Sequence, residues 1–283
     1  MTVNKKHIKS VDGAKIYYEV ALSHNEDLCL VFLHGLGGSL TAWDKEREFF
    51  YNRGLPTAAV DLRGHGFSGR SDKEDFYDLH NFASDVHEIM KAENFANYVL
   101  VGHCFGGMIS ILLEATYPKS SRSLVLVDTS FKPPHFVEEI KKHPLLIKML
   151  SLLARYSPSS YIHEHENFEQ FLGTSDYDPK RIASDLLHTS LKSYLLICKK
   201  LLNYDAISLL GKILVPTLVV DGTDDSIFPP AVAKSLQSRI KRSQLDLIPN
   251  ANHILVVNNP NDLVSEVDNF LVHQNLLKNI QKS

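Results

Sequence analysis

A cysteine in an unusual turn is the first residue of this sequence that could do chemistry. Cys104 stands at the centre of Gly102-His103-Cys104-Phe105-Gly106, directly after an apolar run and directly before a helical pattern. In that context a Gly-x-nucleophile-x-Gly turn presents its central side chain to a pocket, at the positive end of the helix. The flanking glycines are expected because the turn leaves no room for side chains against its neighbours. We predict a nucleophilic thiol; a buried structural cysteine is the alternative.

Several other polar residues fit structural roles better than chemical ones. His103 is expected to form a wall of this turn, His34 to pack its own loop and His65 to lie in a glycine-rich turn. The run HEHE at residues 163–166 lacks the H-E-x-x-H spacing of a metal-binding helix. We therefore expect no metal there, and a solvated segment instead.

Pairing and packing account for the remaining candidates. Asp61 and Arg63 are expected to pair and to fix their loop, and Cys29 and Cys198 to be small core hydrophobes. Three scattered cysteines are too few for a disulfide framework or a zinc site. We therefore expect them to be free thiols in a reducing compartment.

The composition limits which folds and which partners are possible for this chain. A chain of 283 residues with 44% apolar side chains can form one α/β domain with an insertion. Its 30 basic and 33 acidic residues give a net charge of −3 and no single-sign field, so nucleic acid and anionic membranes are poor partners. The N-terminal stretch has no apolar signal region, and no apolar run is long enough to span a membrane. We expect a cytoplasmic location.

Short apolar runs alternate with helical patterns along much of the chain. Near-continuous apolar runs predict strands covered on both faces, and strand–helix–strand repeats predict a mostly parallel sheet with right-handed crossovers. The expected strands are residues 14–22, 27–35, 57–64, 98–104, 123–128 and 217–222, and the expected helices are residues 42–54, 82–95, 106–118 and 230–240.

The alternation stops between residues 131 and 205, where the pattern is helical and punctuated by prolines. We expect helices at 136–156, 168–173 and 181–204. An insertion at the carboxyl edge of a parallel sheet covers the place where open α/β sheets bind ligands. Residues 131–205 are therefore predicted to be a helical lid on a core formed by residues 1–130 and 206–283.

Motifs in chain order identify a family resemblance over nearly the whole sequence. Beside the cysteine turn, the chain resembles the α/β-hydrolase fold superfamily, in its lid-bearing form, at four further stretches. These are HGLGG at 34–38, DLRGHGFS at 61–68, an acid loop DGTDDSIFPP at 221–230, and a base turn PNANH at 249–253. The resemblance implies a mostly parallel central sheet flanked by helices, and no cofactor.

The same resemblance implies a catalytic triad with cysteine in place of the usual serine. Cys104 is then the nucleophile, His253 the general base that becomes the general acid, and a carboxylate orients the ring. Asp225 is favoured because the family's acid usually lies three residues after the glycine of the acid loop. Asp224 is the second candidate, since a motif alignment can slip by one, and Asp128 the third.

An oxyanion hole is implied as well. The backbone N–H groups of Leu36 and Phe105 are expected to form it. Gly37 and Gly38 would let the 34–38 loop approach the nucleophile closely.

A thiol nucleophile restricts the substrate. A thiolate is a better leaving group than an alkoxide, so the tetrahedral intermediate of an ordinary alkyl ester would often return to substrate. Thioesters, enol lactones and activated aryl esters are expected instead, and the substrate class is thus a thioester, lactone or activated ester. Dienelactone hydrolases resemble this chain in triad chemistry alone. Apolar residues between positions 145 and 153 of the lid suggest an apolar acyl or ring-bearing group.

Three functions from different classes remain open. The first is a hydrolase of a small activated acyl substrate through a covalent acyl-enzyme. The second is an acyltransferase, because an acyl-thioenzyme reacts readily with amines in a dry site. The third is a ligand-binding or catalytically weakened protein, including a laboratory Ser-to-Cys change. The sequence does not reveal the oligomeric state.

Overall fold

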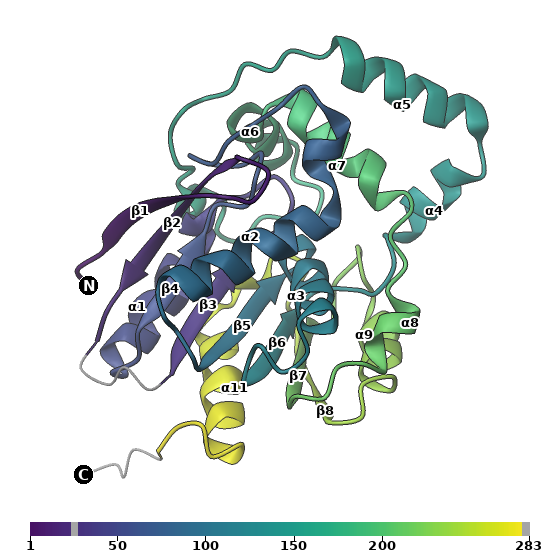
Figure 1. Cartoon of the computed structure of the whole chain (residues 1–283). Helices are drawn as coiled ribbons and strands as arrows, with labels where there is room; N and C mark the ends of the chain where they lie inside the picture. Colours follow the sequence, from purple (N-terminus) through teal and green to yellow (C-terminus); the bar gives the residue numbers. More distant parts are fainter. Residues whose placement is uncertain (24–27, 279–283) are drawn as a thin grey trace.

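The computed structural model describes residues 1–23 and 28–278. A sheet of eight strands forms its centre (Figure 1). The strand order is β1-β2-β4-β3-β5-β6-β7-β8. Pairing is antiparallel between β1 and β2 and between β2 and β4, and parallel elsewhere. The strands are β1 (Asn4–Lys9), β2 (Lys15–Ala21), β3 (Cys29–Leu33), β4 (Thr57–Val60), β5 (Tyr98–His103), β6 (Ser123–Val127), β7 (Thr217–Gly222) and β8 (Ser243–Ile248). This is the mostly parallel central sheet that the sequence predicts.

The six expected strands are β2 to β7, and the two that the sequence reading misses lie at the sheet edges. β1 is largely exposed and carries three lysines, while every residue of β8 but the last is half-buried. Such strands lack the continuous apolar run of a central strand. Asp27, at the start of the expected strand 27–35, lies outside the described residues.

Helices cover both faces of the sheet, and each face has its own apolar core. The side chains of β3, β5, β6 and β7 alternate between the two cores, as the two-residue period of a strand requires. α2 and α3 pack on one face with α8 and α9, and α1 and α11 pack on the other (Figure 1). These helices are α1 (Asp44–Asn52), α2 (Leu79–Ala92), α3 (Phe105–Thr116), α8 (Ile207–Leu210), α9 (Pro230–Gln237) and α11 (Pro260–His273); η1 (Leu40–Trp43), η2 (Glu74–Tyr77) and α10 (Leu255–Asn258) are short.

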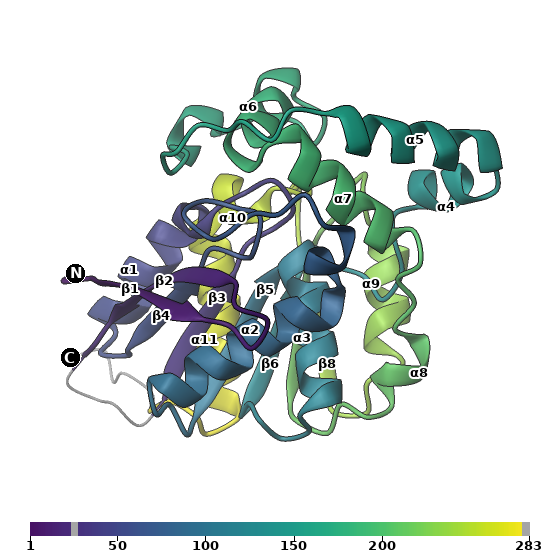
Figure 2. The ribbon, with the colours of Figure 1, turned by 45° about the horizontal axis from the view of Figure 1, so that its top comes forward.

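The inserted segment, residues 131–205, lies between β6 and β7 in the chain and across the end of the sheet where the parallel strands finish (Figure 2). It contains α4 (His135–Lys141), α5 (Pro144–Tyr156), η3 (Phe168–Phe171), α6 (Pro179–Thr189) and α7 (Leu191–Leu201).

Two of the helices expected in this segment are broken. The expected helix 136–156 is interrupted because Pro144 starts α5, and a residue before proline avoids the helical region. The expected helix 181–204 is interrupted at Ser190, which has a positive φ of 76° and caps α7 through its side chain. No helix among the described residues is long and apolar enough to cross a membrane.

Candidate active site

Cys104 lies at a strained turn between β5 and α3. Its φ of 49° and ψ of −110° lie outside the regions that L-residues usually adopt. The neighbouring chain leaves no room for side chains at the two glycines. A Cβ at Gly102 would lie 2.5 Å from the carbonyl oxygen of Gly106, and one at Gly106 would clash with the carbonyl oxygen of Leu33. The turn therefore holds a half-buried thiol at the start of a helix.

His253 and Asp225 meet beside this thiol. Nδ1 of His253 lies 2.8 Å from Oδ2 of Asp225, and both residues are buried. Burial opposes the charged imidazolium. A negative charge on Cys104 and the bond to Asp225 outweigh that effect and raise the pKa of His253 well above its ordinary value. The geometry thus joins the three residue types that nucleophilic catalysis requires.

The other two candidate acids do not contact the imidazole. Asp224 is exposed, and its carboxylate accepts the hydroxyl of Thr223. Asp128 is fully buried, and its Oδ1 accepts the backbone N–H of Gly222 at 3.1 Å. Of the three carboxylates, Asp225 is the one bonded to His253.

A cluster of carboxyl groups that sequence reasoning missed lies beside this pair. Asp128, Asp221 and Asp225 have carboxylate oxygens within 4.8 Å of one another, and all three are buried. Burial raises the pKa of Asp221 to about 8 and that of Asp128 well above its ordinary value. Neither Asp221 oxygen has a hydrogen-bond partner among the residues that the structure describes. The raised pKa values of Asp128 and Asp221 therefore keep this cluster from carrying three adjacent charges at neutral pH.

The expected structural histidines lie around the turn. Burial lowers the pKa of His103 to about 3, so its neutral ring can donate Nε2–H to the carbonyl of His253 at 2.8 Å. His34 Nε2 accepts the N–H of Leu62 at 3.0 Å, and His65 Nε2 accepts the N–H of Gly37 at 3.1 Å. These bonds fix the 34–38 loop.

The 34–38 loop lies against the cysteine turn. A Cβ at Gly35 would lie 2.8 Å from Nδ1 of His103 and 3.5 Å from Cβ of Cys104. The N–H of Phe105 is at the first position of α3, where a helix provides no acceptor. The 34–38 loop and the first turn of α3 therefore adjoin at the thiol.

Residues 165–193 of the inserted segment, which we call the docked half, bond to loops of the core. Oγ1 of Thr189 donates to the carbonyl of Gly37 at 2.9 Å. The carboxylate of Asp176, which sequence reasoning did not single out, accepts the N–H of His253 at 2.8 Å and that of Ser226 at 2.9 Å. Because Asp176 lies 77 residues from His253 and 50 from Ser226, no local sequence pattern indicates these bonds.

The expectation of a solvated HEHE segment is wrong for its second half. The stretch is not helical, and His165 is half-buried with Nε2 at 2.7 Å from Oδ2 of Asp61. Glu166 is buried as well. The buried carboxylate of Asp61 requires a partner, and His165 supplies it from 104 residues away. Although burial opposes it, this bond holds the pKa of Asp61 below its ordinary value.

The expected pairing of Asp61 with Arg63 is also wrong. In addition to its bond with His165, the carboxylate of Asp61 accepts hydrogen bonds from the backbone N–H groups of Leu40 and Phe67. Arg63 instead pairs with the buried Asp85 at 2.7 Å. Neighbouring charges on a turn point in different directions, and each finds a partner in a different element.

The two remaining cysteines are unreactive by environment. Burial raises the pKa of Cys29, which is fully enclosed in β3. It also raises the pKa of Cys198 on α7 to about 12. Both thiols therefore stay protonated at neutral pH. Cys29 is a core residue as expected, whereas Cys198 is half-buried.

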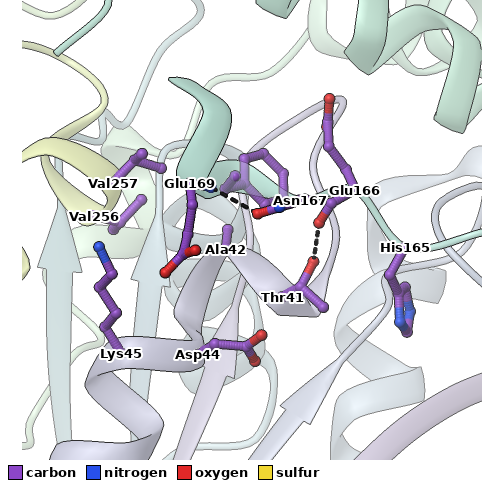
Figure 3. Close-up of a pocket in the computed structure, with 11 residues that line it drawn as sticks. Thr41, Ala42, Asp44, Lys45, His165, Glu166, Asn167, Glu169, Val256 and Val257 are labelled. Carbon is purple, nitrogen blue, oxygen red and sulfur yellow. Dashed lines mark hydrogen bonds between the residues drawn. The ribbon is translucent and has the colours of Figure 1, made fainter. Parts of the chain in front are cut away.

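A cavity of about 370 Å³ opens beside η1, α10 and residues 165–169 (Figure 3). Oγ1 of Thr41 closes one wall by donating to the carbonyl of Glu166 at 2.8 Å. The cavity is lined by Thr41, Ala42, Asp44, Lys45, His165, Glu166, Asn167, Phe168, Glu169, Val256 and Val257. Cys104, His253 and Asp225 are not in that lining.

Known proteins resemble this chain over most of its length. The model of the family described as serine aminopeptidase, S33, matches residues 24–261. Epoxide hydrolase 3 of Xenopus tropicalis is 22% identical over 296 residues, covering 95% of this chain and 79% of that protein. A putative carbamate hydrolase RutD of Caulobacter sp. (strain K31) is 28% identical, covering 93% and 97%. The crystal structure of an esterase RhEst1 from Rhodococcus sp. ECU1013 superposes with a TM-score of 0.69 at 26% identity, covering 96% and 98%.

Proposed function

This chain belongs to the serine aminopeptidase S33 family of α/β-hydrolases, and on that premise we propose that it hydrolyses activated acyl substrates through a cysteine triad. Cys104 is the nucleophile, His253 the acid–base and Asp225 the orienting carboxylate. The observation that carries the proposal is the 2.8 Å bond of His253 to Asp225 beside a strained thiol turn. The family description specifies a serine, whereas the turn of this chain holds a cysteine.

The first half of the reaction forms a thioester on Cys104. A thiolate paired with protonated His253 attacks the carbonyl carbon of the substrate and breaks its π bond. When the tetrahedral intermediate collapses, His253 gives its proton to the departing group. The acyl group then remains on sulfur, and the imidazole is neutral.

The second half returns the enzyme to its starting state. Neutral His253 takes a proton from a water molecule, whose oxygen attacks the thioester carbon. Collapse releases the carboxylic acid and restores the thiolate beside protonated His253. In both halves the N–H groups of Leu36 and Phe105 stabilise the negative oxygen.

The thiol also sets which substrates react. An intermediate on sulfur expels an alkoxide poorly but expels a thiolate or an aryloxide well. We therefore propose thioesters, enol lactones and activated aryl esters as the substrate class, with the inserted segment as a lid over the site. The Rhodococcus protein that resembles this chain is named an esterase, which supports acyl chemistry.

A substrate panel tests the proposal. Matched p-nitrophenyl esters, ethyl esters, acyl thioesters and lactones are compared on the natural chain, Cys104→Ala and Cys104→Ser, with Cys198→Ala as the matched control. We expect activated acyl groups to react at least ~10-fold faster than ethyl esters, and Cys104→Ala to lose about 10³-fold or more in kcat. Cys104→Ser should shift the preference towards oxygen esters.

Two results would overturn it. If Cys104→Ala kept the natural activity, Cys104 would not be the nucleophile. Transfer of the acyl group to an added amine in preference to water would make the protein an acyltransferase.

A further inference from the structure

Asp176 joins two loops of the proposed active site. It lies between η3 and α6 in the docked half, and only 7% of the residue is exposed. Oδ1 accepts the backbone N–H of His253 at 2.8 Å. Oδ2 accepts the backbone N–H of Ser226 at 2.9 Å and the Ser226 hydroxyl at 2.5 Å. One buried carboxylate therefore bridges the base turn and the acid loop.

Both partners of this carboxylate adjoin the triad. Ser226 directly follows Asp225, whose Oδ2 lies 2.8 Å from Nδ1 of His253. The other oxygen of Asp225 accepts two backbone N–H groups of its own loop, at 2.7 and 2.8 Å. The acid loop and base turn are thus joined through the triad side chains and through Asp176, in addition to direct bonds such as that from the N–H of Asp224 to the carbonyl of Ala251 at 2.9 Å.

The main chain of His253 is held on both sides. Asp176 accepts its N–H, and His103 Nε2 lies 2.8 Å from its carbonyl oxygen. Since a side chain leaves the backbone in a direction fixed by its peptide planes, these two bonds aim the imidazole. A misplacement of about 1 Å at a reacting group can cost about 10²-fold in rate.

Further bonds seat the same stretch of the docked half on the base turn. Nδ2 of Asn252 donates to the carbonyl of Thr174 at 2.8 Å, and the N–H of Gly173 donates to Oδ1 of Asn258 at 2.7 Å. Nδ2 of Asn258 also donates to Thr174, at 3.1 Å. Asp176 therefore reaches the base turn only when residues 173–176 are docked there.

We propose that Asp176 is a positioning residue that acts through His253. It keeps the imidazole aligned between Asp225 and Cys104, and it makes that alignment depend on the docking of the inserted segment. The proposal rests on the proposed function, because it assigns a role only if Cys104 and His253 react.

The test compares Asp176→Ala and Asp176→Asn with the control Asp178→Ala. Asp178 lies in the same stretch and accepts the N–H groups of Lys180 and Arg181, so its loss removes a helix cap without touching either active-site loop. With a p-nitrophenyl ester, kcat should fall about 30–100-fold in Asp176→Ala and about 3–10-fold in Asp176→Asn, which keeps one acceptor oxygen. KM should stay within threefold, and Asp178→Ala should keep kcat within twofold.

Alkylation of Cys104 by iodoacetamide, measured on protein that circular dichroism shows to be folded, supplies a readout of imidazole alignment that does not depend on turnover. The rate at pH 6 depends on the aligned imidazolium, whereas at pH 9.5 a free thiol is ionised anyway. We expect the ratio of the two rates to fall about tenfold in Asp176→Ala and to stay unchanged in Asp178→Ala. Because an unfolded chain with a free thiol would also lower this ratio, circular dichroism of each variant at both pH values must show that it is folded.

The outcomes separate this inference from the proposed function. Folded Asp176 variants with natural kcat and a natural alkylation ratio would overturn the inference alone, provided that Cys104→Ala is inactive. Should Asp176→Ala not fold, Asp176→Asn decides by the same two measurements. An active Cys104→Ala would overturn the proposed function, and this inference with it.

Discussion

The two halves of the inserted segment are attached to the rest of the molecule in opposite ways. The docked half bonds to the 34–38 loop, the base turn and the acid loop. The outlying half, residues 134–157, contains α4 and α5. Among the described residues, its hydrogen bonds and ion pairs stay within that half. It is held to α7 by packing instead (Figure 1).

Both halves expose large apolar side chains, but the outlying half exposes seven of them and the docked half four. α5 has a stripe of exposed apolar residues at helical spacing, which includes Leu145, Met149 and Leu153. The docked half instead buries charged groups, among them Asp176 and Asp185. If the proposed triad is correct, the comparison predicts that the docked half, and not the outlying half, sets its geometry. Changes there should alter chemistry or stability strongly, and changes in the outlying half weakly.

The largest effect is expected where the docked half meets the triad. Asp225→Asn should lower kcat by about 10³–10⁴-fold, because the amide no longer stabilises the charged ring or fixes its tautomer. Asp224→Asn, one residue away and exposed, is the matched control and should stay within twofold. Steady-state rates on one activated ester measure both. The reverse ranking would transfer the role to Asp224.

A second contact of the docked half should matter for stability. His165→Ala removes the partner of the buried Asp61 carboxylate and should lower the free energy of unfolding by about 2–4 kcal/mol. His163→Ala, in the same HEHE run but exposed, should change it by less than about 0.5 kcal/mol. Urea unfolding followed by circular dichroism gives both values. Equal values for the two variants would mean that the docking bond contributes nothing.

The buried carboxyl cluster predicts a pH dependence with a definite sign. The pKa of Asp221 is raised from 3.8 to about 8, so from about pH 4 to pH 8 the native chain keeps a proton that the unfolded chain has lost. The free energy of unfolding therefore falls as the pH rises through that window and levels off above it.

Asp221→Asn should remove this dependence. The free energy of unfolding of Asp221→Asn minus that of the natural chain should grow between pH 4 and pH 8, by about 1–2 kcal/mol in all. Urea unfolding across this range measures the trend, with Asp224→Asn as the control that should keep the natural slope. A variant that parallels the natural chain at every pH would show that Asp221 titrates normally.

The smallest effect is expected in the outlying half. Leu153 is 56% exposed, so Leu153→Gln should change the free energy of unfolding by less than about 0.5 kcal/mol and leave kcat within twofold. The matched comparison is Ile197→Ala in α7, fully buried, which should cost about 2–4 kcal/mol. A loss of activity in Leu153→Gln would show that this half also controls the site.

Local sequence predicted the parts of the site that local structure builds. The cysteine turn needs only a strand, two close glycines and a helix in succession, all within about ten residues. The acid at Asp225 and the base at His253 were expected from motif order, and the structure places them in contact. The broken helices at Pro144 and Ser190 show the limit of periodicity, which does not register a backbone interruption.

Tertiary pairing explains what the sequence reading missed. Asp176 meets His253 across 77 residues, and His165 meets Asp61 across 104. In the sequence both appear as ordinary polar residues in a loop, since a buried carboxylate reveals itself only with its partner in place. β8 was missed for a related reason, because an edge strand mixes polar and apolar residues.

Trapping the acyl-enzyme tests the central claim most directly. The natural chain is mixed with a p-nitrophenyl ester, quenched in acid during the first turnover, digested and mapped by mass spectrometry. The account predicts the acyl mass on the peptide that contains Cys104, formed together with the burst of p-nitrophenol, and its absence in Cys104→Ala. Cys198→Ala should form the adduct like the natural chain. An acyl group on another residue, or turnover with Cys104 fully alkylated, would contradict it.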